Sequence, residues 1–198
     1  NTTLTLNGSS NINDNLIAKI DANGTWQWAK SIGSTGSEES GGIEVTNSGF
    51  VYVSGKYYNT ITIGSSILTS RGNSDVYLVN ISSNGTWQWA ISAGGTDADN
   101  SYDVAVDSAG DAYISGIFVN SNITFGNAFT LPGIGTGGFE TYVAKAGANG
   151  TWISGSASAG TQSELIRGID ISSSGTVHVI GKYKGTAIFG NLNASNGG

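Results

Sequence analysis

The sequence of 198 residues contains no cysteine, no methionine, one proline and one histidine. Without cysteine, disulfide bonds cannot contribute to stability, so packing between repeated elements has to supply it. A single histidine excludes metal sites that need several imidazoles, and it leaves His178 as the only candidate base for a Ser-His-Asp arrangement. These absences remove most of the familiar catalytic centres.

Charged residues are also scarce, at 11% of the chain. The eight lysines and arginines are scattered singly in a chain of net charge −6, so there is no basic stripe of the kind that a nucleic-acid backbone needs. No apolar run approaches the roughly 18 residues that a membrane-spanning helix requires. We therefore expect neither nucleic acid nor membrane insertion.

Glycine and small polar residues are abundant instead, with 31 glycines beside many asparagines, serines and threonines. Together with 38% apolar residues, many of them β-branched or aromatic, this composition is typical of an all-β domain with polar turns. The low charge and the Asn-x-Ser/Thr sequences favour an extracellular location. The candidate glycan acceptors are Asn1, Asn7, Asn80, Asn122 and Asn193. The same motif at Asn23, Asn84 and Asn149 has a simpler reason, because Asn-Gly is typical of a tight hairpin turn.

One phrase, Asn-Gly-Thr-Trp, occurs three times, at residues 23–26, 84–87 and 149–152. An interval of about 60 residues indicates a supersecondary repeat that cannot bury its own apolar faces and must stack on its neighbours. The repeat therefore sets the architecture of the chain.

Each repeat is predicted to contain two hairpins. The first encloses the Asn-Gly turn, with strands at residues 16–20, 77–81 and 142–146 before it and at 26–29, 87–90 and 152–155 after it. The second joins residues 43–45, 104–106 or 169–171 to 51–55, 112–116 or 177–181. A variable segment between the hairpins, at 61–69 and 123–131, is predicted to form a small extra hairpin at the rim. Four short antiparallel strands per repeat predict a β-propeller blade.

Two segments, Lys19–Ala29 and Asp103–Gly116, resemble the β-propeller repeats of large secreted surface proteins of bacteria and archaea. The resemblance covers nearly the whole chain, and the second repeat matches best. The third departs from the pattern, with Ser154 in place of the second tryptophan and His178 in place of a tyrosine. The resemblance implies a propeller fold on a secreted or surface protein, without a catalytic assignment.

The chain holds strands for about three blades, which are too few to close a ring. We predict one repeat domain with blade units at approximately 33–93, 94–158 and 159–198, the last completed by residues 1–32 or by a partner. Two arrangements stay open: the residues are a window of a longer blade array, or copies of the chain lend terminal strands to one another. In both, open strand edges at the ends need partners.

All five tryptophans lie just after the Asn-Gly turns, as Trp26, Trp28, Trp87, Trp89 and Trp152. Residues two apart in a strand point to the same face, so Trp26 and Trp28 are predicted to share a face. We interpret the tryptophans as packing residues between blades, each burying up to about 250 Å². Aromatic platforms for sugars are the alternative.

An acidic residue recurs in the loop before the second hairpin, as Glu38, Asp99 and Glu164. We predict that these carboxylates accept backbone N–H bonds and fix the loop between blades. The alternative in the second repeat is a Ca²⁺ site made by Asp97, Asp99, Asn100 and Asp103. The spacing is not that of a 12-residue calcium-binding loop, and we expect no other cofactor.

These features favour a non-enzymatic structural or adhesive module of an extracellular surface assembly, whose partners are copies of itself or further blades. His178 is interpreted as a variant of a structural aromatic, because it occupies the register of Tyr52 and Tyr113. The second hypothesis is a lectin-like propeller that binds surface glycans through loops at the blade ends. The third is a glycoside hydrolase, which needs two carboxylates roughly 5 to 9.5 Å apart, a pair that the sequence does not locate.

Overall fold

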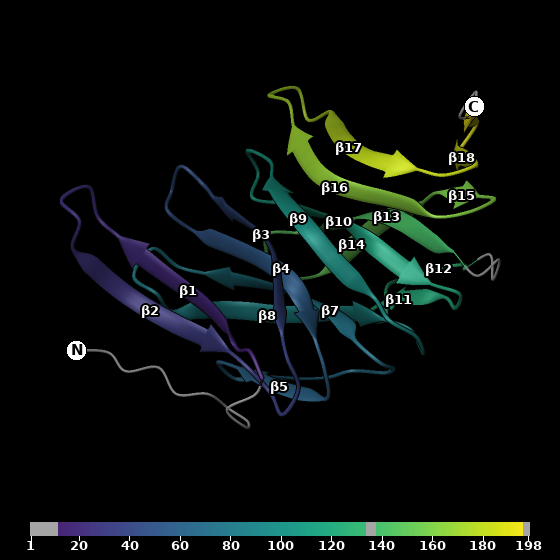
Figure 1. Cartoon of the computed structure of the whole chain (residues 1–198). Coiled ribbons are helices and arrows are strands. Elements are labelled where there is room, and N and C mark those ends of the chain that lie inside the picture. Colours follow the sequence, from purple (N-terminus) through teal and green to yellow (C-terminus); the bar gives the residue numbers. More distant parts are fainter. Residues whose placement is uncertain (1–11, 134–137, 196–198) are drawn as a thin grey trace.

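The computed structural model describes residues 12–133 and 138–195. Every regular element in these residues is a β-strand (Figure 1). The predicted all-β class is therefore confirmed. No helix in this part of the chain is long and apolar enough to cross a membrane.

The hairpins around the Asn-Gly turns form as predicted. They are β1 (Asn15–Ile20) with β2 (Trp26–Ile32), β7 (Asp75–Ile81) with β8 (Trp87–Gly94), and β13 (Phe139–Ala146) with β14 (Trp152–Ala157). In the second of these turns, the backbone nitrogen of Gly85 donates to the carbonyl oxygen of Ser82, and Gly85 has a φ of 85°. Glycine adopts this left-handed conformation without steric cost, which explains why it recurs at the turn.

The second set of hairpins also forms, and each strand extends beyond its predicted bounds. These are β3 (Glu39–Val45) with β4 (Val51–Tyr57), β9 (Asn100–Val106) with β10 (Ala112–Val119), and β16 (Glu164–Ile171) with β17 (Val177–Tyr183). The small extra hairpins are β5 (Thr60–Ile63) with β6 (Ser66–Thr69), β11 (Ile123–Phe125) with β12 (Phe129–Leu131), and β18 (Thr186–Phe189) with β19 (Leu192–Ser195). A short strand, β15 (Ala159–Gly160), pairs with β18.

Two repeats form complete antiparallel meanders. Strands β3, β4, β7 and β8 pair in that order and correspond to the blade unit predicted at 33–93. We number it the second unit, because the half-unit of β1 and β2 precedes it. Strands β11 and β12 extend its sheet to six strands. Strands β9, β10, β13 and β14 make the third unit. The first half-unit (β1 and β2) and the last half-unit (β16 and β17) are two-stranded sheets at opposite ends of the molecule (Figure 1). Within the described residues they do not pair with each other, so β1 and β2 do not complete the sheet of β16 and β17 in this structure.

A β-bulge in the Asn-Gly hairpins changes the expected positions of the tryptophans. Lys19 pairs with Trp28, whereas the next residue, Ile20, pairs with Trp26. Adjacent residues of a strand face opposite sides of the sheet, so Trp26 and Trp28 lie on opposite faces. The prediction that they share a face is wrong because Gln27 is the extra residue of the bulge.

One tryptophan of each pair packs against the next unit. Trp28 lies against Gly85, where an added Cβ would lie 2.8 Å from the indole ring, and its indole N–H donates to Ser83 O over 3.2 Å. Trp89 repeats both contacts one unit later. These two side chains therefore connect neighbouring units, as the interpretation of the tryptophans required.

The other tryptophan packs on a small hairpin. Trp87 lies against Gly64 and Trp152 against Gly126, each the turn glycine of the preceding small hairpin. Trp26 has no such hairpin before it among the described residues, and 69% of it is exposed. Its predicted role in packing between blades therefore does not hold within the described residues.

The apolar core lies between stacked sheets. One cluster joins the second unit to the third and includes Leu78, Ile114, Phe118 and Tyr142. The other joins the first half-unit to the second unit and includes Ile17, Ile32, Tyr57 and Val79. Each sheet therefore depends on its neighbour for a dry interior, as expected for stacked repeats.

The edge strands β3, β9 and β16 contact one another in sequence order. Gly41 of β3 lies directly against the carbonyl oxygen of Ser101 in β9. Further along, the Asp103 carboxylate of β9 accepts a 2.9 Å hydrogen bond from the backbone nitrogen of Ile169 in β16. Because glycine has no Cβ, it permits this close approach of two backbones.

Candidate functional site

Two strand edges that are paired in the complete units have no partner strand in the end units, among the described residues. Strand β4 pairs with β3 on one side and β7 on the other, whereas its counterpart β17 pairs only with β16. Likewise β7 pairs with β4 and β8, whereas its counterpart β1 pairs only with β2. Unpaired backbone N–H and C=O groups of this kind are a template for adding another strand.

Equivalent residues of complete and incomplete units differ sharply in burial. Val53 of β4 is 3% exposed, while Val179 at the same position of β17 is 45% exposed. Tyr77 of β7 is fully buried, while Leu16 at the same position of β1 is 66% exposed. The residues at these positions are apolar in both cases, so the difference comes from neighbouring strands and sheets that the end units lack.

Apolar side chains are also exposed on the flat faces next to the open edges. Ile43 of β3 is 57% exposed, although its counterpart in the third unit, Val104, is 3% exposed. Ile180 of β17 is 73% exposed and Ile153 of β14 is 52% exposed. Each end of the molecule therefore presents an open edge together with an uncovered apolar face.

The recurring loop carboxylates are covered and bind nearby groups of the chain. Glu38 accepts a 2.9 Å hydrogen bond from the backbone nitrogen of Ser34, and Asp99 accepts a 2.6 Å bond from that of Gly95. Glu164 accepts from the hydroxyl of Ser158 over 3.4 Å. All three carboxylates are at most 2% exposed, which suits a structural role.

Each loop carboxylate has a neighbouring carboxylate that the sequence analysis missed. Asp99 lies close to Asp75, since its backbone nitrogen donates to Ser74 O over 2.9 Å. Burial raises the pKa of Asp99 to about 8, to which the charge of Asp75 contributes, and burial raises the pKa of Asp75 to about 6. Asp14 and Glu140 occupy the register of Asp75 in the other hairpins, and this recurrence is the signal that was available.

The proposed calcium ligands are not brought together. Asp99 is directed to Gly95, and Asp103 reaches across to Ile169. No group of three or more histidine, aspartate or glutamate side chains in residues 12–133 and 138–195 is arranged to hold a metal ion. Asp99 and Asp103 therefore serve separate contacts in this structure, and a calcium site made by Asp97, Asp99, Asn100 and Asp103 stays a prediction.

The candidate glycan acceptors differ in accessibility. Asn122 and Asn193 are exposed, while Asn80 is buried in β7 at 2% exposure. Asn1 and Asn7 lie outside the described residues. Because an acceptor has to be reached from solvent, the structure leaves Asn122 and Asn193 as acceptors and disfavours Asn80.

A cavity of about 650 Å³ lies between the second and third units, at the end where their turns at 46–50 and 107–110 meet. Its floor is a cross-strand row in which Glu44 pairs with Tyr52 and Tyr52 pairs with Asn80. The opposite side includes Gly110 and Ala148 of the third unit. The Tyr52 hydroxyl crosses between the two sides and donates to Gly110 O over 2.8 Å.

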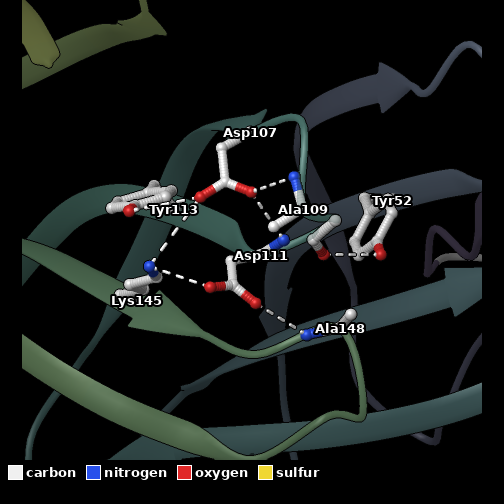
Figure 2. A network of polar contacts seen from close by, with 8 residues as sticks. Tyr52, Asp107, Ala109, Asp111, Tyr113, Lys145 and Ala148 are labelled. Carbon is white, nitrogen blue, oxygen red and sulfur yellow. Dashed lines mark hydrogen bonds and ion pairs between the residues drawn. The ribbon is translucent and has the colours of Figure 1, made fainter. Parts of the chain in front are cut away.

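Figure 2 shows that the third-unit side of this cavity is held by a polar network. Lys145 Nζ lies 2.8 Å from Asp111 Oδ2, and Asp111 Oδ1 accepts a 3.1 Å bond from the backbone nitrogen of Ala148. Asp107 accepts bonds from the backbone nitrogens of Ala109 and Asp111 at 2.9 and 3.0 Å. The turn is therefore fixed before any ligand arrives.

The cavity is acidic. Glu44 and Asp107 line it, and none of the described residues in its lining is a lysine or an arginine, although Lys145 lies behind Asp107 at 3.8 Å. Burial, together with the charges of Asp170 and Asp103, raises the pKa of Glu44 above its usual value. Such a lining favours groups that donate hydrogen bonds and disfavours anions.

Comparison with protein-family models finds no match to this chain, and no curated protein matches it either.

Proposed function

We propose that this chain is a non-enzymatic structural module of an extracellular surface assembly, built from β-propeller blades and joined to further copies or further blades by strand pairing. The joint is made by the open edge of β17 and the open edge of β1. The observation that carries the proposal is the contrast in burial between equivalent positions: β4 and β7 are buried where they pair, and β17 and β1 are exposed.

The arrangement of the sheets supports blades. Each complete unit is a four-stranded antiparallel meander, the connectivity of a propeller blade. The first strands of successive units, β3, β9 and β16, contact one another, while the tryptophans of the Asn-Gly hairpins connect the outer parts. In a propeller, the first strands of neighbouring blades meet near a central axis and the last strands lie at the outside. The strand contacts and the tryptophan contacts of this chain are consistent with that arrangement.

The complete units supply the register of the joint. In the second unit Val51 pairs with Ile81 and Tyr57 pairs with Asp75, and the third unit repeats this register with Ala112 opposite Ala146. Transferred to the open edges, this register pairs Val177 of one copy with Ile20 of the next. The result is a four-stranded blade of β16, β17 and the partner's β1 and β2.

Completion of the blade also covers the exposed faces. Val179, Ile180, Leu16 and Ile20 lie at or beside the new strand pair. Full burial of one such side chain contributes about 1.5–3 kcal/mol, while association costs about 4–15 kcal/mol. Several side chains must therefore be buried together, and a charge placed among them should weaken the joint.

The carboxylates do not favour the hydrolase alternative. A glycoside hydrolase needs a carboxylate pair that reaches a bound sugar, whereas Asp75 and Asp99 are each 2% exposed and lie between sheets. Glu38 and Glu164 are similarly covered.

Cysteine cross-linking tests the joint directly, because the native chain has no cysteine. The register places His178 of one copy opposite Lys19 of the next, so H178C and K19C in one chain should give disulfide-linked oligomers under mild oxidation. The control combines K19C with Val179→Cys, whose side chain points to the other face, and it should cross-link far less. Equal cross-linking of both pairs would contradict the register.

Sedimentation tests the association itself. The native chain should show mass growth with concentration, and Ile180→Lys, at a residue 73% exposed in β17, should abolish it. Ile67→Lys is the matched control, because Ile67 is 70% exposed on the small hairpin β6, away from both edges. A native chain that stays monomeric at micromolar concentration would rule out joining through copies of itself.

A further inference from the structure

At the cavity between the second and third units the repeats differ at several lining positions, and Asn80 is one of them. Lys19 pairs with Trp28 in the first half-unit, and Lys145 pairs with Ser154 in the third unit. The equivalent position in the second unit, opposite Trp89, is occupied by Asn80. The shorter asparagine side chain leaves space that a lysine would fill.

The first half-unit shows what the lysine does. Lys19 Nζ donates to Ser83 O in the next unit over 3.0 Å, and Trp28 donates to the same oxygen. At the corresponding contact of the second unit, Ala148 O accepts a 2.9 Å bond from Trp89 alone among the bonds of the described residues. Ala148 and Asn80 both line the cavity, so the open volume occupies the place of the missing lysine.

Asn80 is also left with an unused donor. Its side chain is 2% exposed, and Nδ2 has no hydrogen-bond partner among the described residues. A buried amide donor without an acceptor costs free energy unless water or a ligand supplies one. Nδ2 is covered in this structure, so an oxygen of a small molecule can accept this bond after the amide turns into the cavity that Asn80 lines.

We propose that this cavity binds a neutral saccharide of one or two rings. Its volume of about 650 Å³ is within the range of small-molecule sites. Sugar hydroxyls both donate and accept hydrogen bonds, which matches the Glu44 carboxylate and the Asn80 amide. Phe50, 37% exposed at the edge of the cavity, offers an apolar ring to the C–H face of a sugar.

The lining distinguishes neutral sugars from charged ones. An anionic sugar would meet Glu44 and Asp107 with no lysine or arginine in the lining to neutralise its charge. The site is separate from the proposed joint, because it lies between two complete units and away from β1 and β17. Binding should therefore persist in the Ile180→Lys variant, which separates failure of this proposal from failure of the assembly.

Nuclear magnetic resonance titration of the full chain provides the test. The probes are the methyl glycosides of glucose, galactose and mannose, N-acetylglucosamine, and galacturonate as the anionic comparison. We expect at least one neutral probe to shift the side-chain amide signals of Asn80 and the backbone signals of residues 46–50 and 107–110. Galacturonate should leave them unchanged.

The decisive variant is Asn80→Lys, which restores the residue of the neighbouring repeats. The lysine should reach Ala148 O, fill the cavity and reduce the affinity for the neutral probe at least tenfold without lowering the melting temperature. Asn193→Lys is the control, since it makes the same change at an exposed site on β19. Should N80K fail to fold, Phe50→Ala is expected to weaken binding several-fold while the chain stays folded.

Three results would overturn the proposal. One is the absence of any shift with every neutral probe. Another is unchanged affinity in N80K, or in Phe50→Ala where that variant replaces it. The third is a response of the same signals to a cationic probe, spermidine, with none to the sugars, because that would make the cavity a cation site.

Discussion

The buried carboxylates Asp75 and Asp99 predict that this chain becomes more stable as the pH falls from 9 to 5. Burial raises the pKa of Asp99 from 3.8 to about 8 and that of Asp75 from 3.8 to about 6. A raised pKa means that the folded state holds these protons more tightly than the unfolded state. The stabilisation is therefore complete below the unfolded pKa near 3.8, declines as the pH rises, and is lost above about 8.

The magnitude follows from the shift. One pKa unit corresponds to about 1.4 kcal/mol, so Asp99 alone contributes at most about 4 kcal/mol between pH 5 and pH 9. The effects of Asp75 and Asp99 are not added, because Asp75 accounts for part of the shift at Asp99. Even about 1 kcal/mol moves the melting temperature of a chain of this size by about 2–4 °C, which differential scanning calorimetry resolves.

The variant Asp99→Asn isolates the contribution. Asparagine keeps the shape of the side chain and can still accept the bond from Gly95 N, but it does not ionise. Its melting temperature should depend on pH less steeply than that of the native chain and should exceed it at pH 9. Glu39→Gln, at a carboxylate whose side chain is 61% exposed, should keep the native slope. A native melting temperature that is flat or rises between pH 5 and pH 9 would refute the reasoning.

Two further predictions concern contacts between units. Gly85→Ala should lower the free energy of unfolding more than Gly24→Ala does. Both residues have positive φ, which costs about 1 kcal/mol for alanine. Only at Gly85 does an added Cβ meet a tryptophan, at 2.8 Å, and this clash adds about 1–3 kcal/mol. Equal urea midpoints for the two variants would show that Trp28 can move away from the added methyl group at no cost in stability. Tyr52→Phe removes the hydrogen bond to Gly110 O and should lower the free energy of unfolding by about 1 kcal/mol. Amide hydrogen exchange in the turn at 107–110 should become faster. Unchanged exchange there would mean that the Asp107 network alone holds the turn.

The strand positions could be predicted because local signals and the repeat agree. The strands of the predicted hairpins have period-2 alternation or an apolar run, and each hairpin turn contains a glycine with positive φ, such as Gly85 or Gly110. The same pattern returns three times, so an error in one repeat is corrected by the others. The small hairpins predicted in the variable segments at 61–69 and 123–131 form at 60–69 and 123–131.

The faces of the tryptophans could not be predicted by counting residues. Alternation assumes an unbroken strand, whereas the bulge at Gln27 moves Trp26 to the face opposite Trp28. The bulge follows from the four-residue turn with glycine at its end, in which Asp21 N donates to Thr25 O and Gly24 N donates to Asp21 O. An Asn-Gly pair alone does not distinguish this turn from a two-residue one.

Contacts between units were harder to predict than the faces of the tryptophans, because they depend on how neighbouring sheets pack against one another. Glu38 and Asp99 were recognised as loop residues, but their carboxylate neighbours Asp14 and Asp75 come from the preceding hairpin. Nor does a sequon reveal burial: Asn80 carries the acceptor motif yet lies in a strand that is buried along its whole length. In both cases the deciding information is the neighbouring sheet.

Repeats provide their own controls, and the differences between units are therefore informative. Positions that keep the same residue and the same contact, such as Gly85 and Gly150 against Trp28 and Trp89, maintain the stack. A position that keeps apolar residues but loses burial, such as Val179 against Val53, indicates a missing neighbour. At a third kind of position the residue changes while its neighbours stay buried, as where Asn80 replaces the lysine of the third unit, Lys145. Because the packing of the units can accommodate a lysine, we interpret this change as functional. The joint and the cavity thus depend on different kinds of departure from the repeat, so loss of one by mutation should leave the other intact.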